Sequence, residues 1–303
     1  IQVLQDTPAG HKVLINDAAK AENIIKYGYP IGHATEALKA GQWVNENNLK
    51  TNLSGTLTYE YHPVNDSLDI KKDNHTFKGY VRKNGEVGVR NEIWVVPTVG
   101  CVNGIAERLV DMLKKETNLE GIDAIHAWHH NYGCSQLSED HENTRKVLRD
   151  IVLHPNAGAV LVVGLGCENN QPDKFEELLG DYDKDRIKFM VVQKVEGDET
   201  EEGMKILRSL YAIAKDDKRT DCPLSELRIG LKCGGSDGFS GITGNPLVGE
   251  LSDFIVAQGG TSILTEVPEM FGAETILMNR CKTEKLFNVR RTLKNKFTGS
   301  ESQ

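Results

Sequence analysis

The pattern of hydrophobic and polar positions changes at about residue 75. Before this point, short apolar runs such as residues 13–15 alternate with turn-forming stretches that contain Pro and Gly. This alternation predicts a small, mostly β module over residues 1–53, with one short helix over residues 18–26. The polar stretch at residues 54–74 is predicted to be a linker.

After residue 75, strand-like runs alternate with stretches of helical periodicity. Ile105, Leu109, Met112 and Leu113 follow the i, i+4, i+7, i+8 spacing of one helix face. Strands and helices in alternation predict an α/β fold with a doubly wound, mainly parallel sheet. We place this domain at residues 75–284, followed by a flexible tail at residues 285–303. The expected strands are residues 92–96, 159–163, 187–192, 227–231 and 262–265, and the expected helices are residues 104–115, 199–214 and 247–258, with another that begins at Pro172.

The composition indicates a soluble globular protein and excludes several functional classes. Of the 303 residues, 39% are hydrophobic and 26% are charged, and the length favours two unequal domains. The longest apolar run, at residues 158–166, is too short to cross a bilayer, and the N-terminus shows no secretion signal. We therefore expect a cytoplasmic protein without a membrane partner. The net charge of −8, with scattered basic residues, argues against nucleic acid as a partner.

Cysteines mark four loops that follow predicted strands. The chain has six cysteines without a CxxC pair, which indicates reduced thiols rather than a disulfide framework or a zinc ribbon. A single cysteine is as often a small buried side chain. The string Gly164-Leu165-Gly166 lacks the third glycine of a dinucleotide fingerprint, so we expect no nicotinamide cofactor. The cysteines that stand near glycine at strand ends, where doubly wound sheets bind ligands, are Cys101, Cys134, Cys167 and Cys233.

The glycine-rich segment at residues 232–246 is the most informative of these loops. Backbone N–H groups and hydroxyls at a helix N-terminus suit a carboxylate or a phosphate, and this segment leads directly into a predicted helix. The alternative is a long glycine-rich connection without a ligand. The segment combines five glycines with Ser236, Asp237, Ser240, Thr243 and Asn245.

Histidines form two further groups. In the N-terminal module, His11 and His33 stand at turns among glycines, where the backbone can approach a ligand. For any one of these histidines, a solvated or structural side chain is the alternative. A density of histidines and carboxylates that suits a divalent metal or proton transfer occurs at His126, His129, His130, Glu139, Asp140, His141 and Glu142.

Several of these strings together resemble the altronate dehydratase and galactarate dehydratase family. The resemblance extends from residue 1 to about residue 281. The sequences of three segments, at residues 97–103, 140–145 and 180–183, are more similar to altronate dehydratases than to galactarate dehydratases. The matching strings are residues 10–13, 27–34, 77–80, 85–91, Tyr132-Gly133-Cys134-Ser135-Gln136, Gly164-Leu165-Gly166-Cys167-Glu168 and residues 233–241.

The resemblance implies a SAF-type β-clip module at residues 1–53 and an iron- or manganese-dependent hydro-lyase of hexuronate catabolism. The expected reaction is the dehydration of D-altronate to 2-dehydro-3-deoxy-D-gluconate. Galactarate dehydratase, a sulfolactate sulfo-lyase-like enzyme and a non-catalytic sugar-acid-binding protein remain alternatives. Family members continue into a further C-terminal region, so we expect this chain to be the front part of such an enzyme. The oligomeric state is left open, and a homo-oligomer is one possibility.

The glycine-lined loops also motivate a hypothesis for the site. Dehydration requires a base that takes the α-proton, an acid that assists loss of the 3-hydroxyl, and a divalent ion that stabilises the enediolate. The residues expected in catalysis are His11, His33, Glu168 and Asp237. The residues expected to bind substrate oxygens are Gly234, Gly235, Ser236, Ser240 and Asn245. The ligands expected for Fe²⁺ or Mn²⁺ are Cys134, Cys167, Cys233 and His129.

Overall fold

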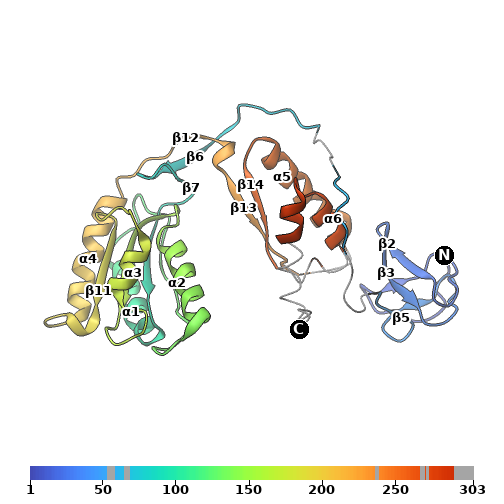
Figure 1. Ribbon diagram of the computed structural model, residues 1–303, viewed down its shortest axis with the longest axis horizontal. Coiled ribbons are helices and arrows are strands. Elements are labelled where there is room, and N and C mark those ends of the chain that lie inside the picture. Colours follow the sequence, from blue (N-terminus) through green and yellow to red (C-terminus); the bar gives the residue numbers. More distant parts are fainter. Residues whose placement is uncertain (53–58, 65–68, 236–238, 267–269, 271–272, 290–303) are drawn as a thin grey trace. The chain divides into compact units, whose positions relative to one another are not determined.

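The protein divides into two compact units (Figure 1). Each unit has its own clusters of buried hydrophobic side chains. Unit 1 combines Ile1–Asp73 with Leu227–Gln303, and unit 2 consists of Asn74–Glu226. The computed structural model describes residues 1–52, 59–64, 69–235, 239–266, 270 and 273–289. Within these residues, no helix is both long and apolar enough to cross a membrane.

The N-terminal part of unit 1 is a small module of antiparallel strands, as the sequence predicts. Strand β1 (Lys12–Val13) pairs with β4 (Trp43–Val44), and β3 (Tyr29–Ala34) pairs with both β2 (Asn23–Lys26) and β5 (Leu49–Lys50). Their inward side chains form one buried cluster, which consists of Leu14, Ala18, Ile24, Ala34, Leu38 and Val44.

The short helix predicted at residues 18–26 is wrong, because the second half of this stretch is strand β2. Ile24 is buried in the module core whereas Ile25 is 58% exposed, which is the two-residue period of a strand. Tyr27 and Gly28 have φ angles of 54° and 84° and form a two-residue turn into β3. Positive φ at both positions is typical of the tightest hairpins, so local turn geometry decides the structure here.

Unit 2 is built on a parallel sheet in which the described strands have the order β11-β10-β8-β9. The predicted strands at residues 92–96, 159–163 and 187–192 are confirmed in this sheet. All six residues of β8 are buried, because the sheet is covered on both faces. The strands are β8 (Glu92–Pro97), β9 (Ala124–Ala127), β10 (Ala157–Gly164) and β11 (Ile187–Val191).

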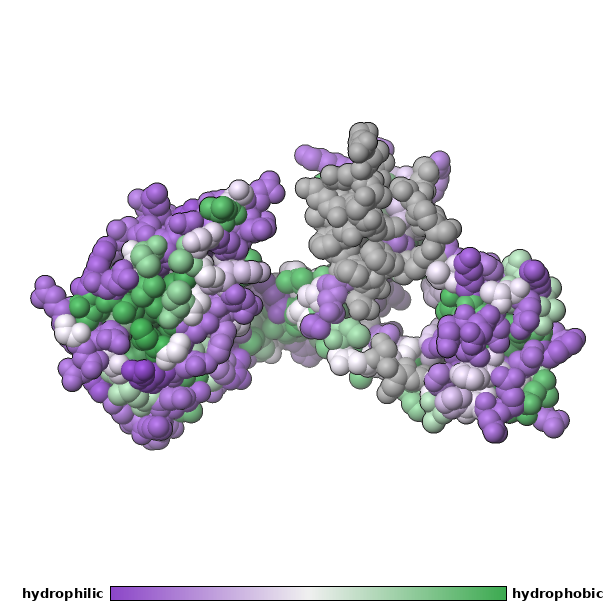
Figure 2. Space-filling view, turned by 90° about the horizontal axis from the view of Figure 1, so that it is seen from below, coloured by the Kyte–Doolittle hydropathy of each residue, from purple (hydrophilic) through white to green (hydrophobic). Residues whose placement is uncertain are grey.

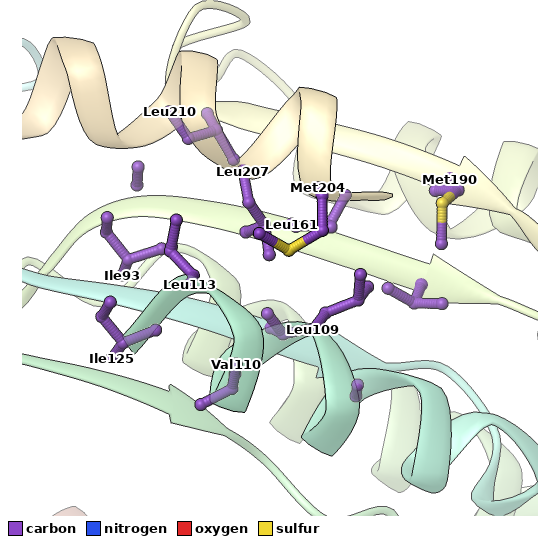
Figure 3. Close-up of a cluster of buried hydrophobic side chains, with 14 of the residues drawn as sticks. Ile93, Leu109, Val110, Leu113, Ile125, Leu161, Met190, Met204, Leu207 and Leu210 are labelled. Atoms are coloured by element: carbon purple, nitrogen blue, oxygen red, sulfur yellow. The ribbon is translucent and has the colours of Figure 1, made fainter. Parts of the chain in front are cut away.

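Helices cover both faces of this sheet, which confirms the predicted doubly wound fold. On one face, Leu109 of α1 and Leu207 of α4 pack in the same buried cluster as Leu161 of β10 (Figure 3). On the other face, Leu148 of α2 and Phe175 of α3 share a second cluster with the sheet. The helices are α1 (Asn103–Glu116), α2 (Ser138–Val152), α3 (Pro172–Leu179) and α4 (Glu199–Ala214).

The remaining elements form two smaller sheets. In unit 2, β6 (Thr76–Val81) pairs antiparallel with both β7 (Val87–Gly88) and β12 (Thr220–Pro223). In unit 1, β13 (Arg228–Leu231) and β14 (Thr261–Leu264) are parallel neighbours, and α5 (Asn245–Ala257) lies between them in the chain. Helix α6 (Glu274–Asn279) follows. The strands and the helix predicted here are confirmed, whereas the predicted domain limits at residues 53, 74 and 284 stay predictions.

Candidate functional site

The carboxyl edge of the unit 2 sheet has the topology of a ligand site. The chain passes from β8 to β9 on one side of β8, and then returns to place β10 on the other side. The loops that leave the neighbouring strands β8 and β10 therefore lead to helices on opposite faces of the sheet. Doubly wound sheets bind their ligands at this point, where the strand order switches direction. These two loops carry Cys101 and Cys167.

The loop after β9 is bound to the loop after β8. The Gly100 N–H donates to the Tyr132 carbonyl at 2.8 Å. The Asn103 side-chain amide donates to the His130 carbonyl and accepts from the His130 N–H, both at 3.0 Å. A Cβ atom at Gly100 would lie 2.9 Å from the Tyr132 carbonyl oxygen, so only glycine allows this approach.

The loop after β9 is also bound to the loop after β10. The Asn169 N–H donates to the Cys134 carbonyl at 2.9 Å, and the Asn169 side-chain amide donates to the Gln136 carbonyl at 3.1 Å. Three of the four predicted cysteine loops thus converge at one edge, which holds Cys101, Cys134 and Cys167.

Glu168 lies at the switch point and is 1% exposed. Its carboxylate accepts hydrogen bonds from the Thr98 hydroxyl at 2.7 Å and from the Leu165 and Gly166 N–H groups at 3.1 and 2.6 Å. These hydrogen bonds therefore hold the loop after β10 against the end of β8. Its geometry is that of a positioning group, and the catalytic role predicted for Glu168 stays a prediction.

The predicted metal ligands are only partly brought together. Cys134 and Cys167 lie on loops that touch, whereas the His129 Nε2 atom lies 2.8 Å from the Glu107 carboxylate on α1. Cys233 belongs to unit 1. Across the described ranges, no three His, Cys, Asp or Glu side chains stand close enough together to hold a metal. Of the four predicted ligands, only Cys134 and Cys167 therefore lie on loops that are in direct contact.

Two buried polar side chains at this edge have atoms without a protein partner. His130 is 8% exposed, and its Nε2 atom has no hydrogen-bond partner in the described part of the chain. Asn170 is 7% exposed, and the same holds for both atoms of its amide. Burial lowers the pKa of His130, and the backbone hydrogen bond to Tyr132 opposes this shift. Because buried polar groups are nearly always paired, these atoms need a polar partner such as an ordered water.

A cavity of about 460 Å³ opens beside His130, between the β9 loop and α2. This volume falls in the range of small-molecule sites. Its polar lining includes Tyr132, Gln136, Asn143 and Thr144. Figure 2 faces the lower end of unit 2 in Figure 1, where the strand-to-helix loops lie, and shows an apolar area with a hydrophilic rim. The lining of the cavity also includes the apolar side chains of Val147, Leu148 and Ile151, and a mixed lining of this kind is typical of sites for small molecules.

A second cavity, of about 490 Å³, lies at the amino ends of β10 and β11. Arg82 and Arg186 both contact the Asp217 carboxylate there, at 2.9 and 2.7 Å. The two guanidinium groups also donate to the carbonyls of Pro155 and Gly158. Since these donors are engaged by the protein itself, this cavity is a structural junction and a weaker candidate for an anion site.

The fourth predicted loop, at residues 232–246, lies in unit 1 after β13. The Cys233 N–H donates to the Glu266 carboxylate at 3.1 Å, and the Lys232 ammonium lies 3.1 Å from it. The Lys232 ammonium, with the Cys233 N–H, lowers the pKa of Glu266. A helical turn, Ser240–Gly244, leads into α5 at Asn245. Gly234 and Gly235 are exposed. Ser236 and Asp237 lie outside the described residues.

His11 and His33 differ in which ring nitrogen is engaged. The Trp43 indole N–H donates to His11 Nδ1 at 3.2 Å, so Nδ1 carries a lone pair. His33 Nδ1 lies 2.7 Å from the Asn52 side-chain oxygen, so Nδ1 carries the proton. In the neutral form, His33 therefore keeps its lone pair on Nε2, which suits a base or a metal ligand.

Most of the chain is similar to one family of known proteins. Three family models match the chain: Altronate/galactarate dehydratase SAF domain at residues 1–52, D-galactarate dehydratase/Altronate hydrolase, second domain at residues 79–215, and D-galactarate/Altronate dehydratase, C-terminal at residues 224–300. The chain is 52% identical to altronate dehydratase of Bacillus subtilis over 95% of its length, and 51% identical to altronate dehydratase of Escherichia coli over 98%. It is 29% identical to galactarate dehydratase (L-threo-forming) of Escherichia coli over 94%.

The chain spans only part of the length of these relatives. It covers 58% of the Bacillus subtilis protein, 60% of the Escherichia coli altronate dehydratase and 57% of the galactarate dehydratase. The matches nevertheless extend over both units, so the β module and the parallel sheet are similar to parts of the same relatives.

Proposed function

Since this chain belongs to the altronate and galactarate dehydratase family, we propose that it is a hydro-lyase that dehydrates D-altronate to 2-dehydro-3-deoxy-D-gluconate. The observation that carries the proposal is the identity of 52% and 51% to two altronate dehydratases, against 29% to a galactarate dehydratase. A cytoplasmic location and a role in hexuronate catabolism form part of the same proposal.

The carboxyl edge of the unit 2 sheet supports the binding of a polyhydroxylated acid. Three loops converge there, and they carry polar side chains such as Tyr132, Gln136 and Asn169 that can bond to hydroxyl and carboxylate groups. Ser240, Asn245, Gly234 and Gly235 remain the predicted substrate contacts in unit 1.

Removal of the α-proton needs a base with an available lone pair. His33 meets this requirement, because its Nδ1–H is held by Asn52 and its lone pair lies on Nε2. His11 has the reverse arrangement, with the proton of the neutral ring on Nε2, which suits an acid that assists loss of the 3-hydroxyl. These roles, and that of Asp237, are part of the proposal.

A divalent iron or manganese ion also belongs to the proposal. Cys134 and Cys167 would hold it, because thiolates are suitable iron ligands and both residues lie on touching loops. When bound, the ion would supply Lewis-acid stabilisation of the charge that develops on the substrate. Cys233 and His129 remain the further predicted ligands.

A keto-acid assay tests the substrate and the metal together. The chain is incubated with altronate or galactarate, with ferrous ion, with manganous ion or with a chelator. We expect keto acid from altronate only in the presence of metal, and a slower reaction of galactarate. If keto acid forms from galactarate and none forms from altronate, the substrate is galactarate. Binding of altronate by calorimetry without keto acid in any metal condition would instead make this chain a sugar-acid-binding protein.

A further inference from the structure

The cavity of about 460 Å³ between the loop after β9 and α2 offers no unpaired positive charge to a ligand. Across the described residues, neither a lysine nor an arginine lines it. Burial lowers the pKa of one lining histidine, His130, and the Nε2 atom of the other, His129, lies 2.8 Å from the Glu107 carboxylate. A carboxylate that enters this cavity therefore meets no free cation to pair with.

One face of α2 supplies the side of the cavity that carries negative charge. The helix residues in the lining recur every three or four positions, which places them on one face of the helix. Among the described residues that line the cavity, Asp140 alone is acidic, and it belongs to this face. Its neighbour Glu139 points about 100° away around the helix axis and does not line the cavity. The lining residues of α2 are Asp140, Asn143, Thr144, Val147, Leu148 and Ile151.

Gln136 adds a second acceptor oxygen to the lining. Its amide nitrogen donates to the Asp140 carbonyl at 3.1 Å and to the Thr144 hydroxyl at 2.7 Å. These two bonds use both hydrogens of the amide, so the side-chain oxygen is what Gln136 can offer to a ligand. Carboxylate and amide oxygens accept hydrogen bonds from hydroxyl groups, but they cannot bond to an ionised carboxylate, which has no hydrogen to donate.

The N-terminus of α2 does not reverse this preference. The positive end of a helix attracts anions, but Glu139 and Asp140 already place two carboxylates in the first turn of α2. A further carboxylate in the cavity would be repelled by the charge of Asp140. The same loop connects the cavity to a predicted metal ligand, because the Cα atoms of Cys134 and Gln136, two residues apart, are separated by at most about 7 Å.

We propose that this cavity holds the uncharged, hydroxylated end of the sugar acid, where the Asp140 carboxylate accepts from a hydroxyl group and repels a second carboxylate. The inference rests on the proposed function and deepens it, because it names a substrate class, the monocarboxylic sugar acids, and a residue that selects it. Altronate ends in a hydroxymethyl group, whereas galactarate carries a carboxylate at both ends. Specificity commonly combines an attractive contact with the right ligand and a repulsive contact with the wrong one.

Removal and reversal of one charge test the repulsion. An Asp140→Asn variant keeps an acceptor oxygen without the charge, and an Asp140→Lys variant places a cation on the same face of α2. Glu139→Gln and Glu139→Lys are the matched controls, because Glu139 is an exposed acid of the same helical turn that does not line the cavity. Each control changes the net charge of the chain by the same amount as its counterpart at Asp140.

The measured quantity is the preference for altronate over galactarate. Calorimetric titration in the presence of a chelator gives it as a ratio of dissociation constants, and the keto-acid assay with metal gives it as a ratio of kcat/KM. We expect the unsubstituted chain to prefer altronate by about tenfold or more. The preference should fall about fivefold in Asp140→Asn and about twentyfold or more in Asp140→Lys, with tighter binding of galactarate. Both Glu139 variants should keep it within about twofold, since solvent screens a charge outside the cavity.

The outcomes distinguish this inference from the proposed function. If both Asp140 variants keep the preference of the unsubstituted chain, the selecting role of Asp140 is wrong and the dehydratase proposal stands. Equal effects of the Asp140 and Glu139 variants would also overturn the inference, because net charge rather than the cavity would then decide the preference. If the unsubstituted chain neither binds altronate nor forms keto acid from it, the proposed function fails and this inference fails with it.

Discussion

At the scale of single residues, the chemistry of the site depends on contacts between positions far apart in the sequence. The position of Glu168, beside Cys167 after a buried strand, could be predicted from the local pattern. Its bond to the Thr98 hydroxyl could not, since 70 residues separate the two. The same holds for His130, whose significance depends on a burial and a bonding pattern that the string of neighbouring histidines does not reveal.

Replacement of Glu168 by Gln should destabilise unit 2. The amide offers a donor where Leu165 and Gly166 already present N–H groups, so at least one buried donor loses its acceptor. We expect the free energy of unfolding to fall by about 1–3 kcal/mol, against about 1 kcal/mol for Thr98→Val, which removes one donor. Urea denaturation measures both. An unchanged unfolding midpoint for Glu168→Gln would show that the carboxylate does not brace the loop.

Replacement of Gly100 by Ala should separate two of the site loops. The new methyl group would lie 2.9 Å from the Tyr132 carbonyl oxygen and 3.0 Å from that of His130. We expect a loss of about 1–3 kcal/mol in the free energy of unfolding. Gly104→Ala is the matched control, because nothing lies within 4 Å of its Cβ position in α1, and it should stabilise by up to about 1 kcal/mol. Equal effects of the two substitutions would contradict the close approach.

At the scale of elements, the structure follows the sequence wherever a local pattern is strong. Helix α1 and strand β10 have a clear period or a fully apolar run, and both were predicted. Helix α2 was missed, because only Leu148 and Val152 of its residues are buried and its first half is polar. Asp140, Asn143 and Thr144 of this polar half line the cavity together with apolar residues of the second half. The polar residues that weaken the helical pattern in the sequence are therefore among those that can bond to a ligand.

The N-terminus of α4 predicts a dependence of stability on pH. The Asp198 carboxylate accepts from the Glu201 and Thr200 N–H groups, and these bonds lower the pKa of Asp198. A lowered folded pKa means that the stabilisation is present above the unfolded value of about 3.9 and is lost as the pH falls through the folded value. An Asp198→Asn variant keeps a capping oxygen that does not titrate.

We therefore expect the unsubstituted chain to lose more stability between pH 5 and pH 2 than the Asp198→Asn variant, by about the contribution of one titrating group. Thermal unfolding at a series of pH values measures this difference. Asp198→Ala should lower the midpoint at neutral pH as well, since it removes the cap. Parallel pH profiles for the unsubstituted chain and Asp198→Asn would show that Asp198 is not the responsible group.

At the scale of the whole molecule, the sequence predicted which elements form but not every sheet to which they belong. Strands β13 and β14 were predicted correctly, yet they pair in a sheet of their own rather than with β8 and β10. Residues of β13 alternate between exposed and half-buried, and most residues of β14 are exposed, whereas all residues of β8 are buried. Strand pairing depends on contacts distant in sequence, so a propensity pattern does not determine it. For the same reason, the convergence of three cysteine loops was predictable only once a parallel sheet was assumed.

We propose that the carboxyl edge of the unit 2 sheet binds the sugar acid, and hydrogen–deuterium exchange of the chain with and without altronate measures this binding loop by loop. We predict slower exchange on ligand addition in residues 98–103, 128–137 and 165–171, which form the loops after β8, β9 and β10. Unchanged exchange in all three loops, with protection around Arg82, Arg186 and Asp217 at the opposite edge, would show that the sugar acid binds elsewhere.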